Sequence, residues 1–176
     1  MSAPLSHLTL LDLSRAKIQA EYAATVTEQR GLSTPLNAIT RNAPVTVAPD
    51  TPIGDALKRM EELRIGSLPV VDGESRPVGI FTRQDVIGRI VLPAVPLSAP
   101  ISGVMSSPAL TLHGESTAGD AALLMARHGI RHVVVTSAEG QVAGVVSERD
   151  LFGLQRLSVR QLSRAIRRAA DLLSLV

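Results

Sequence analysis

The sequence predicts an α+β fold made of two copies of one small β-α-β-β-α unit, and three observations support this prediction. A shift of 65 positions, which carries Asp85 onto Asp150, aligns residues 45–88 with residues 110–153 without a gap. Within each copy, short apolar stretches alternate with an amphipathic helix pattern. Apolar residues make up 45% of the chain and charged residues 19%, so most of the chain can be buried.

Each unit is expected to begin with a short strand and a helix. The strands are VTV at 45–47 and LTL at 110–112, and a turn with an acidic residue follows each. The helices begin at the Gly-Asp-Ala runs at 54–56 and 119–121, where apolar residues recur at helical spacing. A unit of about 55 residues buries little surface alone, so the two units should pack around an approximate two-fold axis, with two related clefts between them.

A hairpin follows the helix in each unit. Its strands are predicted at 67–72 and 77–82 in the first unit, and at 132–137 and 142–147 in the second. The loops between them, DGESR and AEGQ, are polar and contain glycine, as hairpin loops commonly do.

The strongest local pattern ends each hairpin, as GIFTRQD at 79–85 and GVVSERD at 144–150. The glycine lets a ligand or a backbone approach the strand closely, and the hydroxyl and carboxylate lie where the strand meets a helix N-terminus. Free amides there favour phosphate, and an ionised aspartate can accept both hydroxyls of a ribose. The alternative is helix capping, because a Ser or Thr followed three residues later by an acid also caps a helix. The duplication and the matched surroundings favour binding.

The composition bears on location and partners. The chain has no cysteine, which excludes disulfides, thiolate metal sites and a cysteine nucleophile and is typical of a reducing compartment, so a cytoplasmic location is expected. A net charge of +2 gives no reason to expect a nucleic-acid partner. No signal peptide and no membrane span are expected, because prolines interrupt the most apolar stretch, at 90–101.

Over residues 36–153 the chain resembles the CBS-domain pair, also called the Bateman module. The resemblance is carried by VMSSPALTL and its counterpart AITRNAPVTV, the GDA helix starts, IGSLPVV and IRHVVV, and the duplicated glycine-to-aspartate pattern. It implies a tandem of CBS repeats that binds AMP, ADP, ATP or S-adenosylmethionine as a regulatory ligand between the repeats. It also implies a homodimer that needs no cofactor, is not an enzyme, and controls an attached or partner domain.

The resemblance further implies which residues line the two clefts. In the first cleft, Thr40, Val45 and Ile65 are expected to contact the base, and Ser147 and Asp150 the ribose. In the second cleft, Met105, Leu110 and Ile130 are expected to contact the base, and Thr82 and Asp85 the ribose. Phosphate contacts are expected from Arg131, Arg83, Arg149 and His132.

The two clefts should not be equivalent. Thr40 in the first repeat corresponds to Met105 in the second, and Gly66 corresponds to Arg131. These differences leave binding at a single site open.

The domain boundaries follow from the repeat. They are an N-terminal helical extension at 1–35, repeat 1 at 36–92, repeat 2 at 93–153 and a C-terminal amphipathic helix at 154–176. The termini resemble, over a short stretch, those of bacterial signalling proteins in which a nucleotidyltransferase-like region follows the CBS pair. We therefore expect this chain to be part of a longer protein with such an attached domain.

Other patterns favour ordinary structure. His128 and His132 have a metal-ligand spacing, but Gly129 should end the helix between them. Ser14 and Lys17 match an S-x-x-K string without a supporting second motif. An arginine stripe on the last helix is more typical of a solvated face than of a binding surface. The main functional alternative is a structural homodimerisation module that binds no ligand.

Overall fold

The computed structural model describes residues 31–40 and 43–154. Residues Thr34–Leu151 form one compact unit, which contains the strands and the glycine-to-aspartate patterns of both repeats. The predicted terminal extensions fall outside the described residues except for residues 31–35 and 154, which give no test of them.

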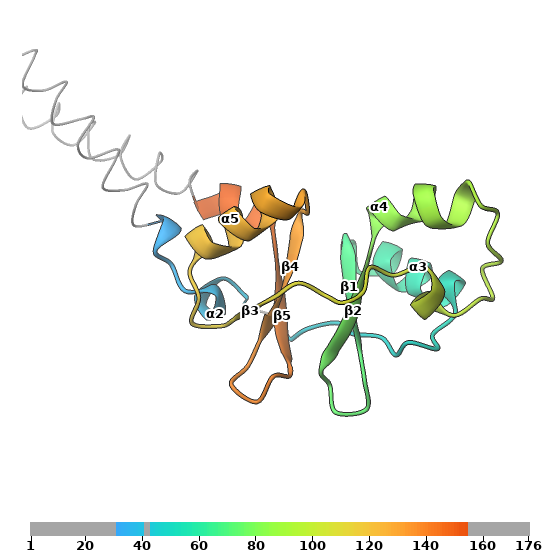
Figure 1. Ribbon diagram of the computed structural model, residues 1–176, viewed down its shortest axis with the longest axis horizontal. Coiled ribbons are helices and arrows are strands. Elements are labelled where there is room, and N and C mark those ends of the chain that lie inside the picture. Colours follow the sequence, from blue (N-terminus) through green and yellow to red (C-terminus); the bar gives the residue numbers. More distant parts are fainter. Residues whose placement is uncertain (1–30, 41–42, 155–176) are drawn as a thin grey trace, which may run out of the picture. The chain divides into compact units, whose positions relative to one another are not determined.

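The first repeat contains the predicted helix and hairpin (Figure 1). Its elements are α3 (Ile53–Glu62), β1 (Ser67–Val71), β2 (Pro77–Thr82) and α4 (Arg83–Asp85). A π-helical stretch, Val86–Val91, continues directly from α4. In place of the predicted strand at 45–47, Val47 forms a single parallel bridge with Val70.

The second repeat has the same order of elements (Figure 1). They are β3 (Thr111–His113), α5 (Ala118–His128), β4 (His132–Thr136) and β5 (Val142–Ser147), and residues 148–154 are again helical. β3 pairs parallel with β4, and β4 pairs antiparallel with β5. The α+β prediction is therefore confirmed, and the bounds of β2 and β5 agree with those predicted from the sequence.

Helix α5 shows how the local sequence fixes an element's ends. At its start, the Thr117 hydroxyl accepts a hydrogen bond from the Asp120 amide at 3.2 Å, while the Asp120 carboxylate accepts one from the Thr117 amide at 2.8 Å. The bond that the Thr117 amide donates to the carboxylate, and then the one that the Thr117 hydroxyl donates to it, lower the pKa of Asp120. At its end, Gly129 adopts a left-handed φ of 62°. The helix therefore stops between His128 and His132, and no group of three metal-ligating side chains occurs within the described residues.

The first segment of each repeat packs on the other repeat, which no sequence pattern predicted. Helix α2 (Leu36–Ile39) opens repeat 1, yet Leu36 is fully buried in the core of repeat 2. The Leu36 amide donates to the Ser116 carbonyl oxygen at 2.8 Å. Conversely, Ile101, near the start of repeat 2, is fully buried in the core of repeat 1. This crossing joins the two repeats into one unit.

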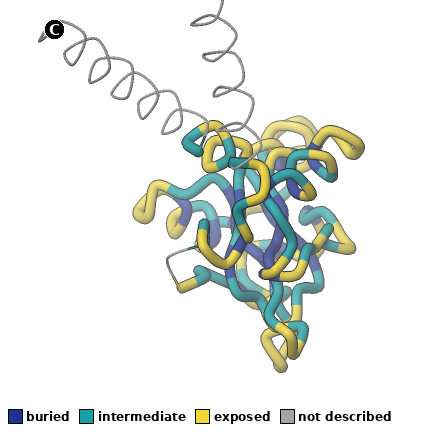
Figure 2. Tube along the Cα trace, turned by 90° about the vertical axis from the view of Figure 1, so that its left-hand side faces the viewer, coloured by how far each residue is buried: buried dark blue, intermediate teal, exposed yellow. Residues whose placement is uncertain are grey.

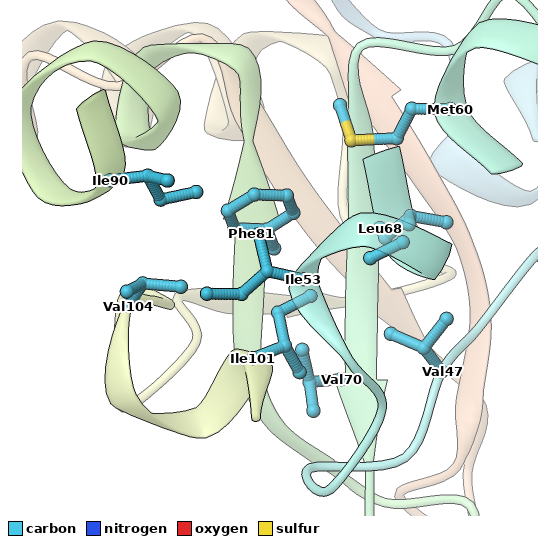
Figure 3. Packing of buried hydrophobic residues seen from close by; sticks show 10 residues of the cluster. Val47, Ile53, Met60, Leu68, Val70, Phe81, Ile90, Ile101 and Val104 are labelled. Atoms are coloured by element: carbon cyan, nitrogen blue, oxygen red, sulfur yellow. The ribbon is translucent and has the colours of Figure 1, made fainter. Parts of the chain in front are cut away.

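Each repeat has its own apolar core. Figure 3 shows the core of repeat 1, where Phe81 on β2 faces Ile53 of α3 and Ile90 of the π-helical stretch. The core of repeat 2 contains small and medium side chains from α2, α5, β4 and β5 and no aromatic ring. Figure 2 shows that the buried stretches lie in the interior and the exposed residues around the outside.

The repeats also contact each other through their strands and hairpin loops. β1 lies beside β5. The Val142 amide donates to the Ser75 carbonyl oxygen at 3.0 Å, and the Gln141 side chain donates to the Glu74 carbonyl oxygen at 3.0 Å. Across the described residues, none of the helices combines the length and the apolar character that a membrane crossing requires.

Candidate functional site

The first candidate corner, defined as Thr82–Asp85, lies where β2 passes into α4. The Asp85 carboxylate folds back onto its own corner, where Oδ2 accepts hydrogen bonds from the Thr82 amide at 2.8 Å and from its hydroxyl at 2.7 Å. The other oxygen, Oδ1, accepts a hydrogen bond from the Ser106 hydroxyl at 3.3 Å and pairs with Nε of Arg89 at 3.3 Å. Asp85 is 6% exposed. Both of its oxygens are thus used by the chain itself.

The second candidate corner, defined as Ser147–Asp150, lies where β5 passes into the helix at 148–154. Oδ2 of Asp150 accepts hydrogen bonds from the Ser147 amide at 2.8 Å and from its hydroxyl at 2.6 Å. Asp150 is exposed, and the described residues place no hydrogen bond or ion pair on its Oδ1. The capping interpretation is therefore confirmed at both corners, while one oxygen of Asp150 faces none of the described donors.

The glycine that opens each pattern allows a side chain to lie against the strand. A Cβ atom on Gly79 would overlap the side chain of Met105, and one on Gly144 would lie 2.7 Å from Cβ of Thr40. Both contacts join the first segment of one repeat to the last strand of the other. Thr40 and Met105 thus lie against the strands that lead to the corners of Asp150 and Asp85, and their roles toward a ligand stay predictions.

Basic residues lie beside the second corner at the start of β4. His132 pairs with Ser147 across the β4–β5 ladder, and its Nε2 would lie 3.2 Å from a Cβ atom on Gly66 of the other repeat. The Arg83 amide donates to the Gly66 carbonyl oxygen at 3.2 Å, and the Glu148 amide donates to the Arg131 carbonyl oxygen at 3.0 Å. These contacts place Arg83, Arg131 and His132 near the corner that ends at Asp150.

The other predicted site residues are placed less directly. Ile65 and Val45 pack at the edge of the first core, and the Ile65 carbonyl oxygen accepts a hydrogen bond from the Arg83 guanidinium at 3.3 Å. Ile130 packs at the edge of the second core, and Leu110 accepts a hydrogen bond from the Val134 amide. Arg149 is exposed on the helix after β5. The structure thus shows contacts of the four apolar residues with strands or cores, and the roles of all five residues toward a ligand stay predictions.

Sequence reasoning missed two residues of the first corner, Ser106 and Arg89. Arg89 follows Asp85 by four positions, a spacing at which oppositely charged helical side chains meet, so this pair had a readable signal. Ser106 had no readable signal, because it reaches Asp85 only through the packing of the first segment of repeat 2 on β2. There Ile80 and Ser106 exchange backbone hydrogen bonds of 2.9 Å.

Burial sets the titration of His132. The largest effect is the loss of water around its half-buried ring, which lowers the pKa of His132 below 6.5. The charge of Asp150 raises the pKa, those of Arg131 and Arg83 lower it, and that of Glu148 raises it. The folded state therefore favours the neutral ring, and the unfolded chain binds more protons just below pH 6.5.

We expect the free energy of unfolding to fall as the pH drops below about 6.5. In His132→Asn, the free energy of unfolding should change less steeply with pH over this range. Urea unfolding between about pH 5 and 7.5 measures it. His128→Asn is the matched control, because His128 is exposed at the end of α5. Equal slopes in His132→Asn and the unmodified chain would show that this ring does not carry the effect.

Comparison with known proteins identifies the family. The family model described as "CBS domain" matches residues 36–92 and 101–156. The chain belongs to the CBS-domain family. The two matches correspond to the two repeats, and the solved structures that resemble the chain include CBS-domain pairs.

Two of these CBS structures contain adenosine compounds. A CBS domain protein from Pyrobaculum aerophilum, complexed with AMP, is 26% identical with a TM-score of 0.65, and the similarity covers 74% of this chain and 98% of that one. The CBS domain pair of protein MJ0100, in complex with 5′-methylthioadenosine and S-adenosyl-L-methionine, is 26% identical with a TM-score of 0.63, and the similarity covers 69% of this chain and 94% of that one.

A curated relative shows that CBS repeats also occur inside a larger enzyme. Inosine-5′-monophosphate dehydrogenase of Aquifex aeolicus is 32% identical over 109 residues, which are 61% of this chain and 22% of the enzyme. The chain thus spans about a fifth of that relative's length, and the similarity gives no reason to assign the enzyme's activity to this CBS pair.

Proposed function

We propose that this CBS pair is a regulatory module that binds an adenosine nucleotide between its two repeats and controls an attached or partner domain. The observation that carries the proposal is that contacts join three basic residues to the corner of Asp150. His132 pairs with Ser147, Arg131 bonds to Glu148, and Arg83 bonds to Gly66, which lies against His132. Arginine donors suit phosphate oxygens, and the carboxylate suits ribose hydroxyls. The related CBS structures that hold AMP or S-adenosylmethionine support the same class of ligand.

The two arginines of this region have exposed side chains that can turn toward a ligand. The ion pair between Arg131 and Glu148 has an N–O separation of 3.8 Å, and both side chains are more than half exposed. Such exposed pairs contribute about 1 kcal/mol or less, so a phosphate group can replace Glu148 as the partner of Arg131 at little cost. The guanidinium of Arg83 is likewise exposed. For regulation, the ligand must bind two arrangements of the module with different affinity.

A thermal-shift screen with AMP, ADP, ATP and S-adenosylmethionine tests the proposal. A ligand that binds only the native state raises the midpoint of unfolding. It stabilises that state by about 2.7 kcal/mol at a free concentration of a hundred times its Kd, and by more at higher concentration. We expect at least one of the four compounds to raise the midpoint, and inorganic phosphate or adenosine alone to raise it less. No response to any of them at millimolar concentration would favour the alternative, a structural dimerisation module without a ligand.

Homodimerisation is part of the same proposal. Three large apolar side chains of the segment after α4 are mostly exposed, at 66% for Ile87, 62% for Val91 and 76% for Leu92. A cluster of this kind on one short segment is typical of a surface that a partner covers, and a second copy of the chain is the partner we propose. Sedimentation at twice the mass of 18.6 kDa would support the dimer, and a monomer at high micromolar concentration would exclude it.

A further inference from the structure

The two corners of the CBS pair differ in how the chain itself uses the aspartate. At the first corner, Ser106 and Arg89 occupy Oδ1 of Asp85, the oxygen that the capping bonds leave free. At the second corner, the described residues provide no such partner to Oδ1 of Asp150. Asp85 is buried and Asp150 is exposed. Within the described residues, only the second carboxylate therefore keeps an oxygen that an added hydroxyl group can use.

The difference originates in the sequence of the helix that follows each corner. Arg89 lies four residues after Asp85, and the residue four positions after Asp150 is Leu154. Leucine has no donor, so the second helix cannot form the ion pair of the first. The residue that corresponds to Ser106 is Arg41, which lies outside the described residues, so the comparison depends on Arg89 and Leu154.

Arg89 also fastens the segment that covers the first corner. Its guanidinium donates to the carbonyl oxygens of Val104, at 3.4 Å, and Met105. Met105 in turn lies over Gly79, where the smaller Thr40 lies over Gly144 at the second corner. Ser106 and Arg89 together occupy the oxygen of Asp85 that a ribose hydroxyl would need.

A ribose at the first corner would have to break these contacts. The Asp85 carboxylate is buried and the Arg89 side chain is half exposed, so separating them leaves a buried charge with less compensation. Each hydrogen bond to a charged group corresponds to roughly a tenfold or larger change in affinity. The second corner requires no such exchange at Oδ1 of Asp150 within the described residues.

We propose that Arg89 and Ser106, by bonding to Oδ1 of Asp85, prevent a ligand from binding at the first corner. The CBS pair then has one nucleotide site per chain, at Ser147–Asp150. This inference depends on the proposed function and makes it more specific. Arg89 is then a specificity-determining residue, since it decides which of two homologous corners accepts a ligand.

Calorimetric titration with AMP, and in a second series with ATP, tests the inference through the number of ligands bound per chain. We expect one per chain for the unmodified protein. Arg89→Leu combined with Ser106→Ala gives the first corner the open carboxylate of the second, and we expect two per chain. Leu154→Arg provides the second helix with the arginine of the first, and we expect its affinity to fall by about tenfold or more.

The outcomes separate the two proposals. Two ligands per unmodified chain, or a folded double variant that still binds one, would overturn the role of Arg89 and Ser106 and leave nucleotide binding intact. If the double variant does not fold, Leu154→Arg decides alone, and unchanged affinity overturns the inference. No binding of either nucleotide to the unmodified chain would overturn the proposed function and this inference with it.

Discussion

Replacement of Phe81 by alanine is expected to lower the free energy of unfolding by about 3–5 kcal/mol, the usual cost of removing a fully buried ring. Phe81 is 0% exposed and packs between α3, β1 and the π-helical stretch (Figure 3). Its neighbours are aliphatic, so no other ring can fill the cavity. Since small proteins are stable by about 5–15 kcal/mol in total, the variant should be marginally folded.

The chain provides a matched control for this prediction. Phe152 is the residue equivalent to Ile87 in the other repeat and is 55% exposed, so Phe152→Ala should change stability by only about 0.5 kcal/mol. Urea unfolding of both variants measures the difference. Similar losses from the two substitutions would contradict the assignment of Phe81 as the central residue of the first core.

Replacement of Asp150 by asparagine is expected to weaken nucleotide binding by about 10- to 100-fold. A hydrogen bond from a hydroxyl group to a carboxylate is worth about 1.5–3 kcal/mol, and most of this is lost when the charge is removed. The carbonyl oxygen of asparagine can still accept the hydrogen bond of the Ser147 amide, so the corner should keep its backbone. Calorimetric titration with AMP or ATP measures the affinity.

Two controls make the Asp150 result specific. Glu62→Gln removes one exposed acidic charge at the end of α3 and should leave the affinity unchanged. Asp85→Asn makes the same change at the first corner, where we expect lower stability and unaltered affinity, because Ser106 and Arg89 use that carboxylate. A loss of affinity in Asp85→Asn that matches the loss in Asp150→Asn would contradict the assignment of the site.

The regular elements could be predicted because their signals are local. The strands at 77–82 and 142–147 are apolar, follow polar loops with glycine, and end at a hydroxyl residue that starts a helix. Gly129 ends α5 because it adopts the left-handed conformation that side chains disfavour. The duplication strengthened each of these predictions, since an element expected in one repeat was expected at the same place in the other.

The remaining features depend on contacts that no local pattern encodes. Leu36 of repeat 1 is buried in the core of repeat 2, and Ile101 of repeat 2 is buried in the core of repeat 1. Nothing in the spacing of these residues distinguishes this exchange from packing within one repeat. The π-helical stretch at Val86–Val91 likewise has no periodic signal of its own.

The candidate site was predictable only in part, because its motifs are local but its surroundings depend on contacts between distant segments. The corner motifs, and the approach of Thr40 and Met105 to their glycines, follow the resemblance. The hydrogen bond from Ser106 to Asp85 could not be predicted without knowing that the first segment of repeat 2 pairs with β2. Residues with the same motif therefore have different surroundings, and the motif alone does not reveal which corner is open.

The most direct measurement is a crystal structure of the chain grown with saturating AMP. We predict one AMP per chain, with its ribose hydroxyls on the carboxylate of Asp150, its phosphate near Arg131, Arg83 or His132, and the Arg89–Asp85 pair unbroken. A ribose bound to Asp85 in place of Ser106 and Arg89, or a nucleotide bound away from both corners, would contradict the account.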